Sequence, residues 1–173
     1  MLPNLSFVLG GAASGKSAFA ENLIRICGKS KTYIATAQAF DPEMMAKITA
    51  HKKMRGAGWR TVEAPLDLGP ALAACPAGDA VLIDCATMWL SNHLLAGSDL
   101  NAAQTTLLAA IGTCAAPVVI VSNEVGHGIV PDNALSRRFR EAQGRLNIAL
   151  AAQADLAVLV VAGLPQTLKG TLP

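Results

Sequence analysis

Residues 5–17 read LSFVLGGAASGKS, a short aliphatic run followed by a glycine-rich turn. The turn matches the spacing G-x4-G-K-[ST], with Gly10, Gly11, Ala12, Ala13, Ser14, Gly15, Lys16 and Ser17 in order. Glycines let the backbone curve around a phosphate with its N–H groups pointing inward, while the lysine supplies a cation and the serine offers a hydroxyl to Mg²⁺. The stretch therefore predicts a phosphate-binding loop between a buried strand and a helix. The alternative is a glycine-rich turn without chemistry.

Apolar runs of strand length alternate with helical patterns along the rest of the chain. The predicted strands are Leu5–Leu9, Thr32–Ala35, Val81–Ile83, Val118–Val121 and Leu156–Val161. The predicted helices are Lys16–Ile26, Asp41–Arg55, Ser98–Ala110 and Asp132–Ala152, with start signals at Asp41-Pro42 and Pro131-Asp132. Continuous β-branched runs that alternate with helices predict an α/β fold, a mostly parallel doubly wound sheet flanked by helices. Because the phosphate-binding loop follows its first strand, we expect this fold to be P-loop NTPase-like.

The composition predicts one folded domain over residues 1–173. The chain is 52% hydrophobic and 15% charged with a net charge of +2, too apolar for disorder and too weakly basic for a nucleic-acid-binding protein. Its apolar run 156–164 is far shorter than the ~20 residues of a membrane span. The four cysteines lack C-x-x-C spacing and are expected to be reduced. With no targeting signal recognised, we expect a cytoplasmic protein.

An acidic residue directly follows one of the predicted buried strands. Three aliphatic residues, 81–83, lead into Asp84. Ligands of parallel sheets bind at the carboxyl ends of the strands, where this carboxylate would lie. Asp84 is therefore predicted to hold Mg²⁺ or its water together with Ser17. The alternative is that Asp84 caps a following helix.

The predicted helix Asp41–Arg55 carries a cationic stripe. Lys47, His51 and Arg55 lie four residues apart, so they share one helix face. Positive neighbours favour the neutral, nucleophilic imidazole and attract phosphates, which makes His51 a candidate covalent phosphorus acceptor. On spacing alone, a solvated helix face is the better explanation.

Several segments beyond the phosphate loop follow one family in order. They are GGAASGKS, YIATAQ, DPEMMAKITAHKKMR, WRTVEAP, VLIDCATMWLSNHL, SNEVGHGIVPDNALSRRFREAQGRLN and VVAGLPQTLKG. Over residues 5–169 the chain resembles the bifunctional adenosylcobinamide kinase/adenosylcobinamide-phosphate guanylyltransferase family of cobalamin biosynthesis. The resemblance implies two reactions. The first phosphorylates adenosylcobinamide with a nucleoside triphosphate, ATP or GTP. The second takes GMP from GTP onto a histidine, releases pyrophosphate, and passes the GMP to adenosylcobinamide phosphate to give adenosylcobinamide-GDP.

The resemblance also implies site residues. The family's guanylylated histidine lies on the helix after the second strand and corresponds to His51. Relatives often have two adjacent histidines there, but this chain has Ala50-His51, so His51 is the only imidazole available. Lys16 is expected to act in both reactions, with Mg²⁺ held by Ser17 and Asp84. The implied nucleotide contacts are Gly10–Ser17, Ala35, Thr36, Ala37, Lys52, Lys53, Met54, Arg55, Glu63 and Asp84.

Chemical sense supports most of these contacts. Lys52, Lys53 and Arg55 can neutralise phosphates, whereas Met54 is expected to pack or to contact through its backbone. Glu63 can accept from a guanine edge or a ribose hydroxyl, and its alternative is a surface glutamate beside a strand.

The loop Asn123–Pro131 contains two glycines and suits a segment that meets the corrinoid, with a tight structural connection as the alternative. His127 is not predicted to be catalytic, and His93 is expected to be a satisfied core or interface histidine. A solvated helix face, or salt bridges across a subunit contact, is expected for Arg137, Arg138, Arg140 and Arg145. The resemblance further implies a homotrimer, which the apolar composition fits.

Three other functions stay open on the sequence. A family member could retain guanylyl transfer without the kinase reaction. A plain P-loop small-molecule kinase could use the same loop, with the cationic stripe binding an anionic substrate. A non-catalytic module could bind ATP or GTP without turnover of cobinamide.

Overall fold

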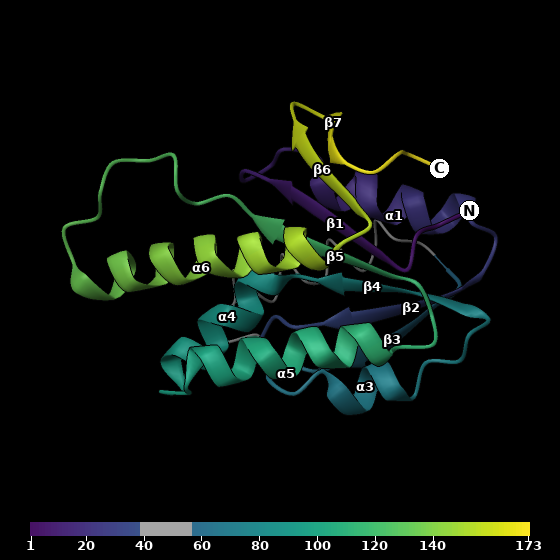
Figure 1. Ribbon diagram of the computed structural model, residues 1–173, viewed down its shortest axis with the longest axis horizontal. Helices are drawn as coiled ribbons and strands as arrows, with labels where there is room; N and C mark the ends of the chain where they lie inside the picture. The colour runs from purple at the N-terminus through teal and green to yellow at the C-terminus, as the bar shows by residue number, and fades with distance from the viewer. Residues whose placement is uncertain (39–56) are drawn as a thin grey trace.

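The computed structural model describes residues 1–38 and 57–173, which form a seven-stranded sheet flanked by helices (Figure 1). Across the sheet the strands lie in the order β3-β2-β4-β5-β1-β6-β7. Neighbours from β3 to β6 pair in parallel, and β7 pairs antiparallel with β6. The α/β, mostly parallel, doubly wound sheet predicted above is confirmed. The strands are β1 (Leu5–Gly10), β2 (Ser30–Ala35), β3 (Trp59–Glu63), β4 (Asp79–Asp84), β5 (Val118–Asn123), β6 (Leu156–Val161) and β7 (Leu164–Lys169).

Helices cover both faces of the sheet, because successive strand residues point to opposite sides and both sides are apolar. On one face, Val8, Leu82 and Val119 are fully buried in the cluster that includes the apolar side of α1 (Lys16–Ile26). On the other face, strand residues such as Ile83 pack with four helices. These helices are α3 (Gly69–Ala73), α4 (Ala86–Leu95), α5 (Leu100–Thr113) and α6 (Ala134–Gln153).

The carboxyl ends of the parallel strands meet at one edge of the sheet. In the strand register, Ala35 of β2 lies between Glu63 of β3 and Asp84 of β4. Gly10 of β1 likewise lies opposite Asn123 of β5. Because ligands of such sheets bind at this edge, the fold gathers several predicted site residues where a nucleotide would be held.

Two predicted helix starts differ from the structure. The cap of α6 is Asn133, whose side chain accepts from the Ser136 N–H, so the helix begins after Asn133 and not at Asp132. The cap of α5 is Asp99, which accepts from two N–H groups of the first turn, so that helix begins after the predicted Ser98. An Asp or Asn side chain caps a helix where it can reach the free N–H groups of the first turn. Residue spacing alone does not identify which of several candidate residues does so.

Strands β3 and β7 were not predicted as strands. Every residue of β7 is exposed, and β3 is at most half-buried, so neither has the continuous buried run of a central strand. The predicted helix Asp41–Arg55 lies outside the described residues.

All four cysteines are free, as predicted. Burial raises the pKa of the Cys85 thiol to about 11, with the neighbouring Asp84 adding to the effect, so this thiol stays protonated and packs as a small apolar group. Among the helices of the described ranges, none has the length and apolarity that crossing a membrane requires.

Candidate functional site

The phosphate loop lies between β1 and α1, as predicted, and its glycines are required by close contacts. A side chain on Gly10 would collide with Ser14 Oγ and would lie 2.7 Å from the Val160 carbonyl oxygen. Gly15 has φ +92°, a backbone conformation that favours glycine, and caps α1. The loop is closed by the Ser14 N–H, which donates to the Gly11 carbonyl at 3.3 Å.

A two-residue turn between β6 and β7 contacts the phosphate loop and holds it by a backbone hydrogen bond. Ala162 and Gly163 both have positive φ, the geometry of a tight hairpin. The Gly163 N–H donates to the Ser14 carbonyl at 2.8 Å, and a side chain on Gly15 would lie 3.0 Å from Gly163 Cα. This support was not predicted, because Ala-Gly is not one of the usual hairpin dipeptides and β7 is an exposed strand without an apolar run.

Lys16 lies over the loop at the start of α1. Its ammonium donates to the Gly11 carbonyl at 3.0 Å. Burial lowers the pKa of Lys16, and the nearby Cys85 and Asp84 partly oppose that shift. The lysine is therefore a desolvated cation close to the carboxylate at the end of β4, the arrangement that stabilises phosphoryl charge.

Ser17 and Asp84 fit the oxygen ligands that Mg²⁺ prefers. Both are half-buried, and the Asp84 carboxylate accepts from the Tyr33 hydroxyl at 3.2 Å. Within the two described ranges, no group of three or more His, Cys, Asp and Glu could hold a metal by itself. Mg²⁺ needs no such cage, because it keeps water and phosphate oxygens as ligands and takes one or two from the protein. The residues present therefore fit a nucleotide-bound Mg²⁺.

Thr36 ties the end of β2 to the start of α4. It is fully buried, and its hydroxyl donates to the Cys85 carbonyl at 2.7 Å and accepts from the Cys85 N–H at 2.8 Å. Asn92 donates to the Thr36 carbonyl at 2.8 Å. The Thr36 hydroxyl is thus committed to the protein, and the half-buried Ala35 and Ala37 present the accessible surface at this edge.

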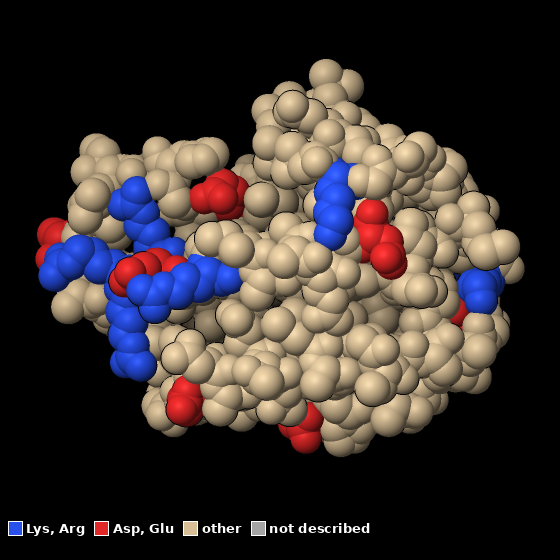
Figure 2. All heavy atoms as spheres, in the orientation of Figure 1, with Lys and Arg blue, Asp and Glu red and all other residues tan. Residues whose placement is uncertain are grey.

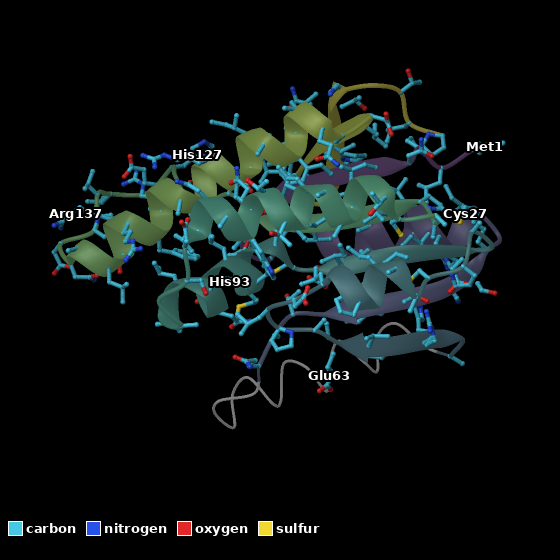
Figure 3. The ribbon with its side chains drawn as sticks, turned by 60° about the horizontal axis from the view of Figure 1, so that its bottom comes forward. Met1, Cys27, Glu63, His93, His127 and Arg137 are labelled. Atoms are coloured by element: carbon cyan, nitrogen blue, oxygen red, sulfur yellow. The ribbon has the colours of Figure 1, made fainter. Side chains whose placement is uncertain are left out.

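Glu63 is exposed at the carboxyl end of β3, where Figure 3 shows it. The remaining predicted group, His51, Lys52, Lys53, Met54 and Arg55, lies outside the described residues, as does Lys47. The structure thus places the phosphate loop, Ala35, Glu63 and Asp84 at the same edge of the sheet, with Ala35 next to both carboxylates in the strand register.

The two described histidines lie in different surroundings. The His93 ring nitrogens contact Ser98 Oγ at 3.0 Å and the Leu66 carbonyl at 3.2 Å, and the ring packs edge-on to Trp89 with centroids 4.5 Å apart. His93 is therefore a satisfied histidine, as predicted. His127 is exposed in the loop after β5 (Figure 3).

Basic side chains gather over the N-terminal half of α6 (Figure 2). Arg140 donates to the Gly126 carbonyl, and Arg137 donates to the carbonyls of Pro131 at 3.0 Å and Asp132 at 2.7 Å. These two arginines hold the loop that follows β5, a role that the sequence analysis missed because helix spacing does not report contacts with a loop. Arg145 forms a salt bridge with Glu141 at 2.6 Å, one turn away on the exposed face of the same helix.

Comparison with known proteins gives a consistent result. Residues 6–168 match the family model described as cobinamide kinase / cobinamide phosphate guanyltransferase. The bifunctional adenosylcobalamin biosynthesis protein CobP of Pseudomonas aeruginosa is 44% identical over 94% of this chain and 96% of its own length. The bifunctional adenosylcobalamin biosynthesis protein CobU of Salmonella typhimurium is 43% identical over 94% and 98%.

Among solved structures, the RadB recombinase matches with a TM-score of 0.50 and 17% identity, covering 91% of this chain and 74% of that protein. At this identity the likeness shows the fold alone.

Proposed function

The chain belongs to the cobinamide kinase / cobinamide phosphate guanyltransferase family of enzymes, and from this premise we propose that it performs both reactions on adenosylcobinamide. It phosphorylates the substrate hydroxyl with ATP or GTP, then transfers GMP from GTP to the resulting phosphate. The products are adenosylcobinamide-GDP and pyrophosphate. The observation that supports this proposal most directly is the phosphate loop Gly10–Ser17 beside Asp84 at the carboxyl edge of the sheet.

In the kinase reaction, positively charged groups of the site stabilise the negative charge on the phosphoryl group as it is transferred. The loop N–H groups and the N-terminus of α1 cradle the phosphates, while Lys16 compensates the charge that spreads over the equatorial oxygens. Ser17 and Asp84 would hold Mg²⁺, which when bound neutralises charge on the phosphate oxygens.

The guanylyl reaction proceeds by two displacements with His51 as the nucleophile. The imidazole nitrogen forms a P–N bond with the α-phosphorus of GTP while the bond to pyrophosphate breaks. A phosphate oxygen of adenosylcobinamide phosphate then attacks the same phosphorus, and the P–N bond breaks. In this proposal Lys52, Lys53 and Arg55 compensate phosphate charge, and Met54 contacts the nucleotide through its backbone or by packing. Glu63 holds the guanine or ribose. Ala35, Thr36 and Ala37 form the wall between Glu63 and Asp84.

Labelling tests the covalent reaction. GTP labelled at the α-phosphate should give a protein adduct that is acid-labile and base-stable, as phosphoramidates are. His51→Ala should abolish the adduct while kinase activity persists, and Lys16→Ala should weaken both reactions. A label that remains in His51→Ala would overturn the assignment of the nucleophile.

Product analysis separates the alternative functions. Adenosylcobinamide with ATP, GTP and Mg²⁺ should yield adenosylcobinamide-GDP and pyrophosphate. A plain kinase would leave a nucleoside diphosphate and no pyrophosphate. A guanylyltransferase without kinase activity would act only when adenosylcobinamide phosphate is supplied.

We also propose a cytoplasmic homotrimer. Exposed aliphatic side chains on α6 and the preceding loop, including Ile129, Leu135 and Ile148, support a subunit contact in this region. Light scattering on the purified protein measures the mass of the assembly, and a monomer would refute this part of the proposal.

A further inference from the structure

A buried polar network crosses the interface between α6 and the end of β5. Gln143 is fully buried, and its Nε2 donates to Ser122 Oγ and to Asn147 Oδ1, both at 2.9 Å. Ser122 Oγ in turn donates to Asn147 Oδ1 at 2.6 Å. Gln143 and Asn147 lie one helical turn apart on α6, so the helix presents both amides to the same strand.

The network ends on the backbone of Asn123, the last residue of β5. Asn147 Nδ2 donates to the Asn123 carbonyl at 3.2 Å. The Asn123 N–H donates to Thr87 Oγ1 at 2.8 Å, and Thr87 lies in the first turn of α4, shortly after Asp84. Both backbone groups of Asn123 are therefore fixed by side chains from two different helices.

Asn123 is next to the start of the phosphate loop. It lies opposite Gly10 in the strand register, and the following residue, Glu124, donates its N–H to the Gly10 carbonyl at 3.0 Å. The network thus links α4, which follows Asp84, with the strand that flanks Gly10. A shift of Asn123 would be passed to the loop that holds the phosphates.

Stability alone does not account for a glutamine at position 143. Its Oε1 is buried and has no hydrogen-bond partner among the described residues. A buried acceptor without a partner opposes folding, whereas an apolar side chain of similar shape would not carry that penalty. Unpaired buried polar groups are rare in native proteins, so each calls for an explanation, and the position of Gln143 beside the end of β5 supplies one.

We propose that Gln143 is a positioning residue for both transfer reactions, acting through Ser122, Asn147 and Asn123 on the phosphate loop. This inference rests on the proposed function, because its kinetic test measures the rates of the two proposed transfer reactions. Replacing Gln143 leaves the loop N–H groups and Lys16 in place, so nucleotide binding persists. The alignment of the phosphates against the acceptor changes, and small misplacements cost far more in kcat than in KM.

The test compares Gln143→Met with Gln153→Met. Gln153 lies on the same helix, and its amide donates to the Leu108 carbonyl outside the network. Gln143→Met should leave the melting temperature unchanged or raised, lower kcat of both reactions about tenfold, and leave KM for GTP within about twofold. Gln153→Met should leave kcat unchanged. Wild-type turnover of both substrates establishes the proposed function separately from this comparison.

Amide hydrogen exchange supplies a readout that does not depend on turnover. Gln143→Met should speed exchange at Asn123 and Glu124 relative to Gln153→Met. If Gln143→Met does not fold, Ser122→Ala removes the centre of the network with a smaller change and should give the same pattern. Unchanged exchange at these amides, wild-type kcat in a folded variant, or an equal loss in Gln153→Met would each overturn the proposal.

Discussion

The backbone N–H of Gly163 donates to the carbonyl oxygen of Ser14 at 2.8 Å, so the turn between the last two strands holds the phosphate loop that follows the first. A backbone hydrogen bond of this kind survives most side-chain substitutions. It is sensitive to the space around Gly15, because the two glycines approach each other closely.

Gly15→Ala should therefore weaken nucleotide binding. Any side chain at φ +92° strains the backbone by about 1–2 kcal/mol, and a methyl group at 3.0 Å from Gly163 Cα also pushes the turn off the loop. Gly28→Ala is the matched control, since Gly28 has φ +70° but open space around it. Calorimetric titration with GTP should show a loss of affinity for Gly15→Ala alone. Equal affinities in the two variants would contradict the role of the turn.

Nucleotide affinity should fall at alkaline pH. Burial lowers the pKa of Lys16 from its ordinary value of 10.5, so the ammonium loses its proton, and the phosphates lose their cation, as the pH rises through that lowered value. The effect on stability has the opposite sign, because the penalty for burying the ammonium is relieved by the same deprotonation.

Titrations of GTP from neutral pH to about pH 10 check this dependence, with Lys16→Arg as the comparison because arginine keeps its charge throughout the range. The alkaline fall in affinity should be absent in Lys16→Arg. The same fall in both proteins would assign the dependence to another group.

Thr36→Val should destabilise the fold without touching the phosphate loop. The variant leaves the Cys85 N–H and carbonyl without their hydroxyl partner, at a cost of about 1–3 kcal/mol per unsatisfied group. For a chain of this size, each kcal/mol lowers the melting temperature by about 2–4 °C. Thr36→Ser keeps the hydroxyl and should stay closer to the wild-type melting temperature. Equal melting temperatures for the two variants would show that these hydrogen bonds contribute little.

Asp84→Asn should reduce kcat/KM of the kinase reaction on the order of a hundredfold, the scale of losing one preorganised electrostatic group. It should also raise the Mg²⁺ concentration needed for half-maximal rate, because an amide is a weaker ligand than a carboxylate. Tyr33→Phe removes the 3.2 Å hydrogen bond to Asp84 but leaves the charge, so its Mg²⁺ dependence should remain near wild type. A Mg²⁺ dependence that Asp84→Asn leaves unchanged would remove this residue from the metal site.

The fold could be predicted from the sequence where burial is continuous. The central residues of β4 and β5 are buried on both faces, so 80–83 and 118–121 are continuous aliphatic runs that stand out from the helical patterns. The exposed β7 has no such run, and its pairing with β6 depends on the turn at Ala162-Gly163.

The residues that hold the site in place through long-range hydrogen bonds could not be predicted in the same way. The spacing G-x4-G-K-[ST] identifies the phosphate loop because its chemistry is local. Gln143 has the appearance of an ordinary polar helix residue, and its partner Ser122 is 21 residues away in the chain. Hydrogen bonds over such separations leave no periodic pattern, which is also why the contacts of Arg137 and Arg140 with the loop after β5 were missed.

The position of β1 inside the sheet, between β5 and β6, has a consequence for biosynthesis. Both of its neighbours, β5 and β6, are translated much later than β1 itself. While the ribosome is still adding these segments, the first strand exposes aliphatic side chains and free backbone groups on both edges. Such non-local pairing slows folding and leaves an aggregation-prone intermediate. The nascent chain should therefore depend on chaperones until β5 and β6 have been synthesised.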